Sequence, residues 1–276
     1  MNATPRVLHP RLFLGTSAWS NRDWEGIVYP PGTPSRDYLS HYASRFRAVE
    51  TDSTWYHTPS RNTTRRWAAL LPEGFRMAAK VPRVITHEKL LVDCERELEE
   101  FLAAMEPLRD RIGPLLFQFP YFGRASGIDS SVFMKRFAGL SASLTKPFRF
   151  AVEVRNKGWI DAALLDLLAR REVALTLIDH PWMPPIERTM ESIDPVITDF
   201  VYIRWLGDRH GIEKVTRTWD RLVVDRQRET RAWAGAIRNL LERDVTVYGF
   251  FNNHYAGHAP GSIALFESIW DAISEE

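Results

Sequence analysis

The sequence has very little cysteine, since Cys94 is the only one among 276 residues. A single cysteine excludes an internal disulfide framework and a structural zinc site built from cysteines. It is also typical of proteins that work in a reducing compartment. We therefore expect a cytoplasmic location.

The sequence also lacks the apolar segments that membrane insertion needs. No run approaches the roughly 18 apolar residues of a membrane-spanning helix. Residues 1–11 contain prolines and arginines but no apolar stretch of the kind found in a signal peptide. We therefore expect no membrane partner.

Neither sign of charge is in excess. The 36 lysines and arginines nearly balance the 35 aspartates and glutamates, which gives a formal net charge of +1. No overall electrostatic field therefore favours nucleic acid as the default partner. Two groups of arginines leave a local basic patch open as an alternative, although arginines beside acids are typical of solvated helix faces: Arg61, Arg65 and Arg66, and Arg226, Arg228 and Arg231.

Several motifs of large enzyme classes are missing. The sequence contains no GxGxxG, no Walker A sequence, no HExxH and no GxSxG, and the segment GTSAW at residues 15–19 lacks the closing glycine of the last of these. These absences argue against a dinucleotide-binding fold, a P-loop nucleotidase, a zinc protease of the HExxH type and an α/β-hydrolase.

What the sequence does contain is an eightfold alternation of short apolar runs and helical patterns. Such alternation is typical of βα units with a parallel sheet, and eight units in this length favour a closed barrel over an open sheet. We predict an α/β fold, a (β/α)₈ TIM barrel that forms a single domain over residues 1–276 with its core at about 12–274. The predicted strands are residues 12–16, 48–52, 76–80, 115–119, 150–154, 174–178, 200–205 and 245–251.

Local signals predict where some helices begin and end. Ser35, Ser60 and Asp161 are candidate helix caps, and Pro72–Glu73–Gly74 predicts a turn before the third strand. Residues 260–273 supply the eighth helix. Residues 82–93 and 180–199 are predicted to be long loops, and long ordered loops in compact domains are often functional.

Polar residues concentrate where the predicted strands end. In a TIM barrel the loops that follow the strands converge on one face and build the site there. The residues at these positions are Thr16 and Ser17, Glu50, Asp52 and Ser53, Lys80, Arg83 and His87, Gln118, Glu153 and Arg155, Asp179, Arg204, and Asn252 and Asn253.

Charges inside apolar strands are costly to bury unless they are paired. One interpretation is a structural ion-pair network that closes the top of the barrel. The other is a binding site with acid and base groups, for which Glu50 and Glu153 are the catalytic candidates and a glycosidase-like separation of their carboxyls would favour sugar cleavage. Lys80 is either an amine nucleophile or the salt-bridge partner of Glu153, and the second is favoured.

Tryptophans and histidines gather in the same loops. Trp19, Trp24, Trp55, Trp159, Trp182 and Trp205 either stack on sugars or bases or pack the loop layer. His87, His180, His254 and His258, with Glu153 and Asp179, could hold a divalent metal, although no spacing is diagnostic and the cofactor stays unknown.

The loop after the eighth strand, residues 252–261, contains glycines and opens a helix. Backbone N–H groups at such a position favour an anion, and TIM barrels often bind phosphate after strands seven and eight. Gly207 after the seventh strand fits this interpretation. The alternative is tight loop closure in which Asn252 and Asn253 cap the backbone.

Together these strand-end motifs resemble those of the DUF72 (YecE-like) family. The resemblance covers nearly the whole chain and implies a TIM-type barrel, but it implies no established activity. The sequence departs from the family pattern at Ala18, Asp52 and Leu206, where glycine, asparagine and histidine are usual. The motifs are GTSAW at 15–19, VETDSTWY at 49–56, KVP at 80–82 with ITH at 85–87, GPLLFQFP at 113–120, AVEVR at 151–155, FVYIR at 200–204, FNNH at 251–254 and GHA at 257–259.

The leading hypothesis is a hydrolase-like enzyme that acts on an anionic or polyhydroxylated substrate. The alternatives are a metal-dependent phosphodiesterase or nuclease, and a non-catalytic protein that binds nucleic acid or another protein. Glu50, Glu153 and Lys80 are the predicted catalytic residues. The predicted substrate-binding residues are Thr16, Trp19, Asp52, Tyr56, His87, Gln118, Arg155, Asp179, Arg204, Asn252, Asn253 and His258.

Overall fold

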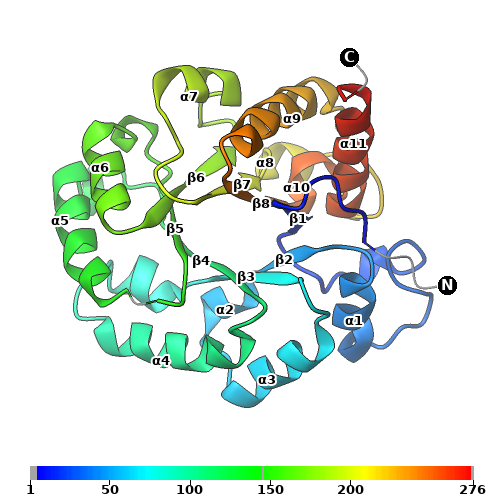
Figure 1. The fold of residues 1–276 in the computed structure, drawn as a ribbon, viewed down its shortest axis with the longest axis horizontal. Helices are drawn as coiled ribbons and strands as arrows, with labels where there is room; N and C mark the ends of the chain where they lie inside the picture. Colours follow the sequence, from blue (N-terminus) through cyan, green and yellow to red (C-terminus); the bar gives the residue numbers. More distant parts are fainter. Residues whose placement is uncertain (1–4, 145, 275–276) are drawn as a thin grey trace.

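The computed structural model describes residues 5–144 and 146–274 and shows one closed barrel of eight parallel strands (Figure 1). Each strand pairs with the next along the chain, and β8 closes the barrel on β1 with Leu12 opposite Val247. The predicted (β/α)₈ barrel is therefore confirmed, while the domain boundaries stay a prediction. The strands are β1 (Leu12–Thr16), β2 (Ala48–Thr51), β3 (Arg76–Lys80), β4 (Ile112–Gln118), β5 (Phe150–Glu153), β6 (Val173–Asp179), β7 (Phe200–Trp205) and β8 (Thr246–Phe251).

The start of β4 is the largest difference from the predicted strands. This strand begins at Ile112, three residues before the predicted start, and runs through Gly113 and Pro114. Glycine and proline are usually strand breakers, but proline is tolerated close to the start of a strand. The register between β3 and β4 shifts between Met77 and Ala79, next to this start.

Helices follow the strands and form a ring around the barrel, as Figure 1 shows. Ser60 and Asp161 cap α3 and α6 as predicted, since their side chains accept the N–H of Thr63 and Leu164. The α-helices are α1 (Tyr38–Ala43), α2 (Ser53–Tyr56), α3 (Arg61–Leu70), α4 (Glu95–Met105), α5 (Ser130–Leu140), α6 (Ala162–Arg170), α7 (Ile186–Ser192), α8 (Arg209–Ile212), α9 (Gln227–Glu242), α10 (Asn253–Ala256) and α11 (Ala259–Ala272).

Three local predictions were wrong. Ser35 is not a cap but the first residue of the short helix η2 (Ser35–Asp37). The segment 82–93 contains a π-helical turn, η3 (Val84–Glu88), and the segment 180–199 contains α7. These helices are one or two turns long, so their apolar residues are too few to show a helical period.

Two apolar clusters fill the fold. The larger one lies between the strands and the surrounding helices. The smaller one takes residues from all eight strands, and we identify it with the interior of the barrel: Phe13, Ala48, Ala78, Leu116, Ala151, Ala174, Phe200, Tyr202, Tyr248 and Phe250.

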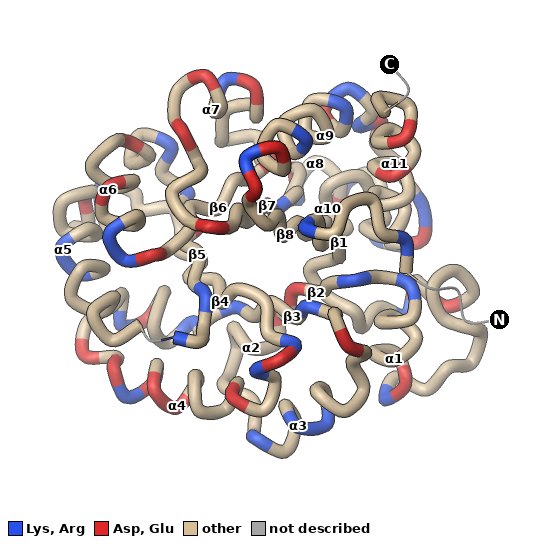
Figure 2. The backbone as a smooth tube through the Cα atoms, viewed as in Figure 1, with Lys and Arg blue, Asp and Glu red and all other residues tan. Residues whose placement is uncertain are grey.

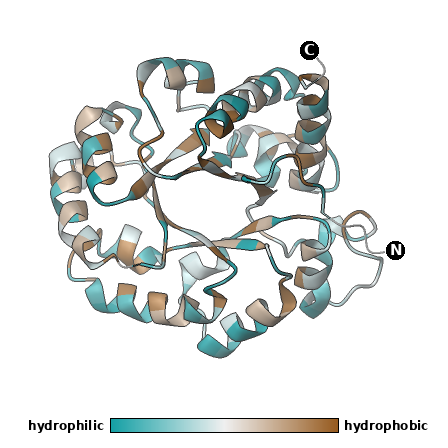
Figure 3. Cartoon of the chain, viewed as in Figure 1, coloured by the Kyte–Doolittle hydropathy of each residue, from teal (hydrophilic) through white to brown (hydrophobic). Residues whose placement is uncertain are grey.

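The outer surface is polar. Lysines and arginines are interspersed with aspartates and glutamates over the outer ring (Figure 2), and the exterior sides of the helices are hydrophilic while the strands are mostly apolar (Figure 3). Within residues 5–144 and 146–274, no helix combines the length and the apolar character needed to cross a membrane.

The strand β2 approaches β1 closely at Gly15. A Cβ atom at this position would lie 1.9 Å from the carbonyl oxygen of Ala48. We expect Gly15→Ala to lower the free energy of unfolding by about 1–3 kcal/mol or more, because the strands must separate to accept the methyl group. Urea unfolding measures the change.

The matched control is Gly139→Ala in α5, where an added Cβ meets no atom within 4 Å. Alanine is the better helix former, so this variant should gain roughly 0.5–1 kcal/mol. Equal stability of the two variants would contradict the close approach at Gly15.

Candidate functional site

Charged residues lie directly above the apolar interior of the barrel. Successive side chains of a strand alternate between its faces, so the residues two positions after the interior cluster point the same way. Glu50 follows Ala48, Lys80 follows Ala78, Glu153 follows Ala151 and Arg204 follows Tyr202 at this spacing. Three of the four side chains have almost no exposed surface: Glu50, Glu153 and Arg204.

Arg204 joins the two buried glutamates. Its Nη2 and Nε donate to Oε1 of Glu50 at 2.7 and 3.2 Å, and its Nη1 donates to Oε2 of Glu153 at 2.7 Å. The three residues belong to β7, β2 and β5. One guanidinium therefore connects three separate parts of the barrel wall.

The remaining oxygens of both carboxylates are also engaged. The Tyr202 hydroxyl donates to Oε2 of Glu50 at 2.6 Å, and Nε of Arg155 donates to Oε1 of Glu153 at 2.6 Å. All four carboxylate oxygens thus accept a hydrogen bond, as buried charges require. The ion-pair network that the sequence left open as an alternative is present.

The two glutamates differ in their electrostatic surroundings. Burial raises the pKa of Glu153, but attraction to Arg155 and Arg204 outweighs burial and lowers the pKa to about 2. Burial raises the pKa of Glu50, against the opposing attraction of Arg204. Burial lowers the pKa of Arg204, but the negative charges of Glu153 and Glu50 outweigh burial and hold this pKa above the ordinary arginine range. Glu153 and Arg204 are therefore a permanent ion pair at neutral pH.

A second ion pair lies closer to solvent. Lys80 Nζ is 2.9 Å from Oδ1 of Asp52, and their side chains are 10% and 36% exposed. The same Asp52 oxygen is 3.9 Å from Nη2 of Arg204. The prediction that Lys80 pairs with Glu153 was therefore wrong in its partner, because Asp52 at the end of β2 is the nearer carboxylate.

A pocket of about 510 Å³ opens above these pairs at the carboxyl ends of the strands. Lys80, Arg155, Arg204 and Arg209 bring four cationic groups to its wall, and Asp52 and Asp208 bring two carboxylates. Seven of the predicted catalytic and substrate-binding residues line it: Asp52, Tyr56, Lys80, Gln118, Arg155, Arg204 and Asn252.

Glu50 and Glu153 are not part of the pocket wall. Each is 0% exposed and lies beneath the pocket, bonded to Arg204. Two carboxylates on one guanidinium do not flank a cleft in the manner of a glycosidase pair. Their assignment as catalytic residues stays a prediction.

Three predicted site residues lie on the outside of the barrel wall or in the first loop. Asp179 accepts the indole N–H of Trp233 at 2.7 Å, which ties the end of β6 to α9. Thr16 is buried and donates its hydroxyl to the carbonyl of Ala18 at 2.6 Å. Trp19 packs edge-on against Trp67, with 5.4 Å between ring centroids.

The loop after β8 closes on itself. Asn252 Oδ1 accepts the N–H of His254 at 3.0 Å, and Asn253 Oδ1 accepts the N–H of Ala259 at 2.8 Å. His258 Nδ1 accepts the N–H of Gly261 at 3.1 Å and caps α11. Loop closure by capping side chains, the alternative to an anion site at this loop, is the arrangement observed.

The predicted metal ligands do not converge. Within the part of the chain that the structure describes, no group of three or more His, Cys, Asp or Glu side chains is placed to hold a metal ion. His180 and His254 line the polar pocket, whereas His258 packs against Trp24 with 6.3 Å between ring centroids.

His87 lies beside the pocket rather than in its wall. Its Nδ1 is 2.8 Å from the Thr86 hydroxyl, and its ring packs edge-on against Trp55 at 5.0 Å. Burial, followed by the positive charges of Arg83 and Lys80, lowers the pKa of His87 to about 4. The imidazole is therefore neutral at neutral pH.

Part of the site was not predicted from the sequence. Tyr202 was not singled out, although its position two residues before Arg204 on the same strand face is a usable signal. The pocket residues Asp208, Arg209 and His210 follow β7 in a polar segment without a motif. The packing tryptophans Trp24 and Trp205 are fully buried, while Trp55 and Trp182 reach the pocket.

Comparison with known proteins identifies relatives of unassigned activity. The family model described as "Protein of unknown function DUF72" matches residues 13–275. The UPF0759 protein YecE of Escherichia coli K12 is 30% identical over 174 residues, which are 61% of this chain and 59% of the relative. The chain thus spans about 59% of the length of the curated relatives it matches.

Solved structures support the fold. A DUF72 family protein from Thermotoga maritima superimposes with a TM-score of 0.71 at 24% identity, covering 96% of this chain and 99% of that one. A D-psicose 3-epimerase superimposes with a TM-score of 0.55 at 10% identity, covering 95% and 97% of the two chains. At these identities the likeness shows the barrel architecture alone.

The lowered pKa of His87 predicts a pH dependence of stability. Between the ordinary histidine value of about 6.5 and the folded value of about 4, the unfolded chain binds more protons than the folded one. Stability should therefore fall as the pH falls through this window. We expect His87→Gln to lose less stability than the parent between pH 7 and pH 4.5 in urea unfolding; equal losses would contradict the assignment.

Proposed function

This chain belongs to the DUF72 family, whose description assigns no function, and from its site we propose a hydrolase-like enzyme that acts on an anionic, hydroxylated substrate. The observation that carries the proposal is the Asp52–Lys80 pair, 2.9 Å apart in a pocket whose wall also contains Arg155 and Arg204. A carboxylate and an ammonium group open to a pocket are suited to proton transfer beside a bound anion. The single buried Cys94 supports a cytoplasmic location.

We place proton transfer at Asp52 and Lys80 rather than at Glu50 and Glu153. The glutamates are 0% exposed, and all their oxygens accept hydrogen bonds within the protein. Asp52 is 36% exposed and reaches the pocket. The glutamates instead act as positioning residues that hold Arg204 in place.

In this proposal the cationic groups of the pocket wall bind a negatively charged group of the substrate. Arg204 has no freedom to move, because three of its bonds go to buried carboxylates. Arg155 uses its Nε on Glu153 and has a side chain that is 21% exposed. Guanidinium groups fixed in this way bind carboxylate or phosphate oxygens without reorganisation.

Other wall residues suit a hydroxylated body. The amides of Gln118 and Asn252 offer donors and acceptors for hydroxyl groups. Trp55 and Trp182 bring aromatic faces, on which sugar rings commonly stack.

In the proposed reaction water cleaves a glycosidic C–O bond, or the acyl C–O or P–O bond of an ester. Asp52 accepts a proton from the attacking water, Lys80 supplies a proton to the departing oxygen, and solvent restores both groups. The products are an alcohol and an acid or a free sugar, so the overall change is the addition of one water molecule. Arg155 and Arg204 hold the anionic group throughout.

The alternatives have less support. A metal-dependent phosphodiesterase needs a ligand cluster that the described residues lack. For nucleic-acid binding, Arg226 is already engaged in the fold, since its Nε donates to the carbonyl of Tyr255 at 3.0 Å.

A matched substrate panel tests the proposal. The panel contains sugar phosphates and 4-nitrophenyl glycosides of uronic acids, with the corresponding neutral sugars and glycosides as partners. We expect the anionic members to raise the melting temperature more than the neutral ones and at least one of them to be hydrolysed. Asp52→Asn should then lower kcat by about 100-fold or more, since acid–base groups typically contribute 10²–10⁴-fold.

The controls are Asp166→Asn and Lys135→Gln, which change exposed charges on α6 and α5 away from the pocket. They should leave hydrolysis unchanged. Binding without hydrolysis of any panel member would contradict the enzymatic proposal, and equal binding of neutral and anionic members would contradict the role of the cations.

A further inference from the structure

The barrel wall opens between β5 and β6 above the apolar interior. The register of these strands ends at Val152 and Leu175, but β6 continues to Asp179 and there pairs only with β7 on its other side. By contrast, β7 and β8 pair at six positions, up to the end of both strands. The gap leaves one edge of β6 facing a cleft.

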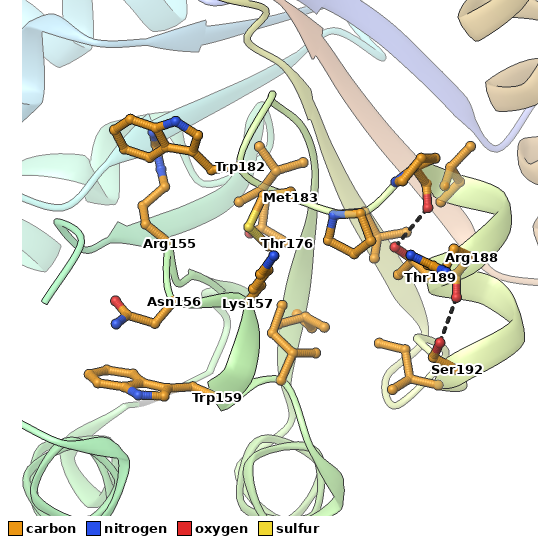
Figure 4. Close-up of a pocket in the computed structure, with 18 of the residues that line it drawn as sticks. Arg155, Asn156, Lys157, Trp159, Thr176, Trp182, Met183, Arg188, Thr189 and Ser192 are labelled. Atoms are coloured by element: carbon orange, nitrogen blue, oxygen red, sulfur yellow. Dashed lines mark hydrogen bonds between the residues drawn. The ribbon is translucent and has the colours of Figure 1, made fainter. Parts of the chain in front are cut away.

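This cleft has a volume of about 1170 Å³ and lies between β6, the loop after β5 and α7. Figure 4 shows Trp159, Thr176, Met183 and Arg188 around it, on the loop after β5, on β6, on the loop after β6 and on α7. A cleft of this size accommodates a small organic molecule.

Thr176 indicates that the cleft is built for a ligand. Its hydroxyl oxygen is buried without a hydrogen-bond partner, and the residue is 2% exposed and lines the cleft. An unpaired buried hydroxyl is costly. A polar atom of a bound molecule would remove that cost.

The charges around the cleft have one sign. Arg155, Lys157 and Arg188 line it, and none of the described residues in its wall is an aspartate or a glutamate. The rest of the wall is mainly apolar, with Trp159 and Met183 on opposite sides in Figure 4. The wall therefore matches a molecule with an apolar body and a negative charge.

We propose that the β5–β6 cleft binds an amphipathic organic anion. The apolar body lies between Trp159, Met183 and the apolar side of β6. The negative group is held by the cations of the wall, and a polar atom next to it accepts the Thr176 hydroxyl.

The cleft adjoins the polar pocket. Arg155, Pro181 and Trp182 line both spaces, so a molecule in one lies next to the other. Binding in the cleft does not require that the polar pocket catalyse a reaction, and it can be measured without turnover.

Calorimetric titration with octanoate and with 1-octanol tests the proposal, because the two probes share an apolar chain and differ in charge. We expect octanoate to bind at least tenfold more tightly than 1-octanol. The double variant Lys157→Gln/Arg188→Gln should weaken octanoate binding by about fivefold to tenfold, the sum of two exposed charge contacts. Thr176→Val, which keeps the side-chain shape, should weaken it about threefold or more.

The matched control is Lys135→Gln/Arg221→Gln, which removes two exposed charges outside the cleft. It should leave octanoate binding unchanged, and circular dichroism melting checks that every variant folds. The proposal is overturned if octanoate does not bind, if 1-octanol binds equally well, or if the cleft variants bind like the parent. None of these results bears on hydrolysis in the polar pocket.

Discussion

The charge of Arg204 is the constraint on which the rest of the site depends. A buried guanidinium is stable only when carboxylates neutralise it and its donors are satisfied. Here Glu50 and Glu153 meet both conditions from two other strands, at 2.7 Å each. The carboxylates in turn need Tyr202 and Arg155 to complete their hydrogen bonds. One charge in the interior therefore fixes side chains from three strands.

This network divides the barrel into layers with separate roles. Apolar side chains fill the interior below it, and an open pocket with Asp52 and Lys80 lies above it. The two glutamates thus bond to partners inside the protein, while Arg155, whose side chain is 21% exposed, and the buried Arg204 border the pocket. An arrangement of this kind holds guanidinium donors in fixed positions beside a ligand and leaves the Asp52–Lys80 pair at the pocket wall for proton transfer.

The sequence predicted the barrel well because eight apolar runs at regular spacing leave few alternatives. It also predicted which strand ends carry polar side chains, since period-two alternation places Glu50 and Arg204 on the interior face. It could not predict which carboxylate pairs with Lys80, because the register of the neighbouring strands β2 and β3 and the reach of the side chains decide that Asp52 is the partner. The early end of the β5–β6 pairing, which opens the cleft, has no local sequence signal. The hydrogen bond from Trp233 of α9 to Asp179 at the end of β6 has none either.

A double-mutant cycle on Glu153 and Arg204 tests the central claim most directly. Glu153→Gln and Arg204→Met each remove one partner of a buried ion pair. Each variant should lower the free energy of unfolding by about 3–5 kcal/mol. The double variant should cost less than the sum by about 2–3 kcal/mol, because neither charge is then left without its partner. Additive losses within about 0.5 kcal/mol in urea unfolding would show that Arg204 does not hold the site together.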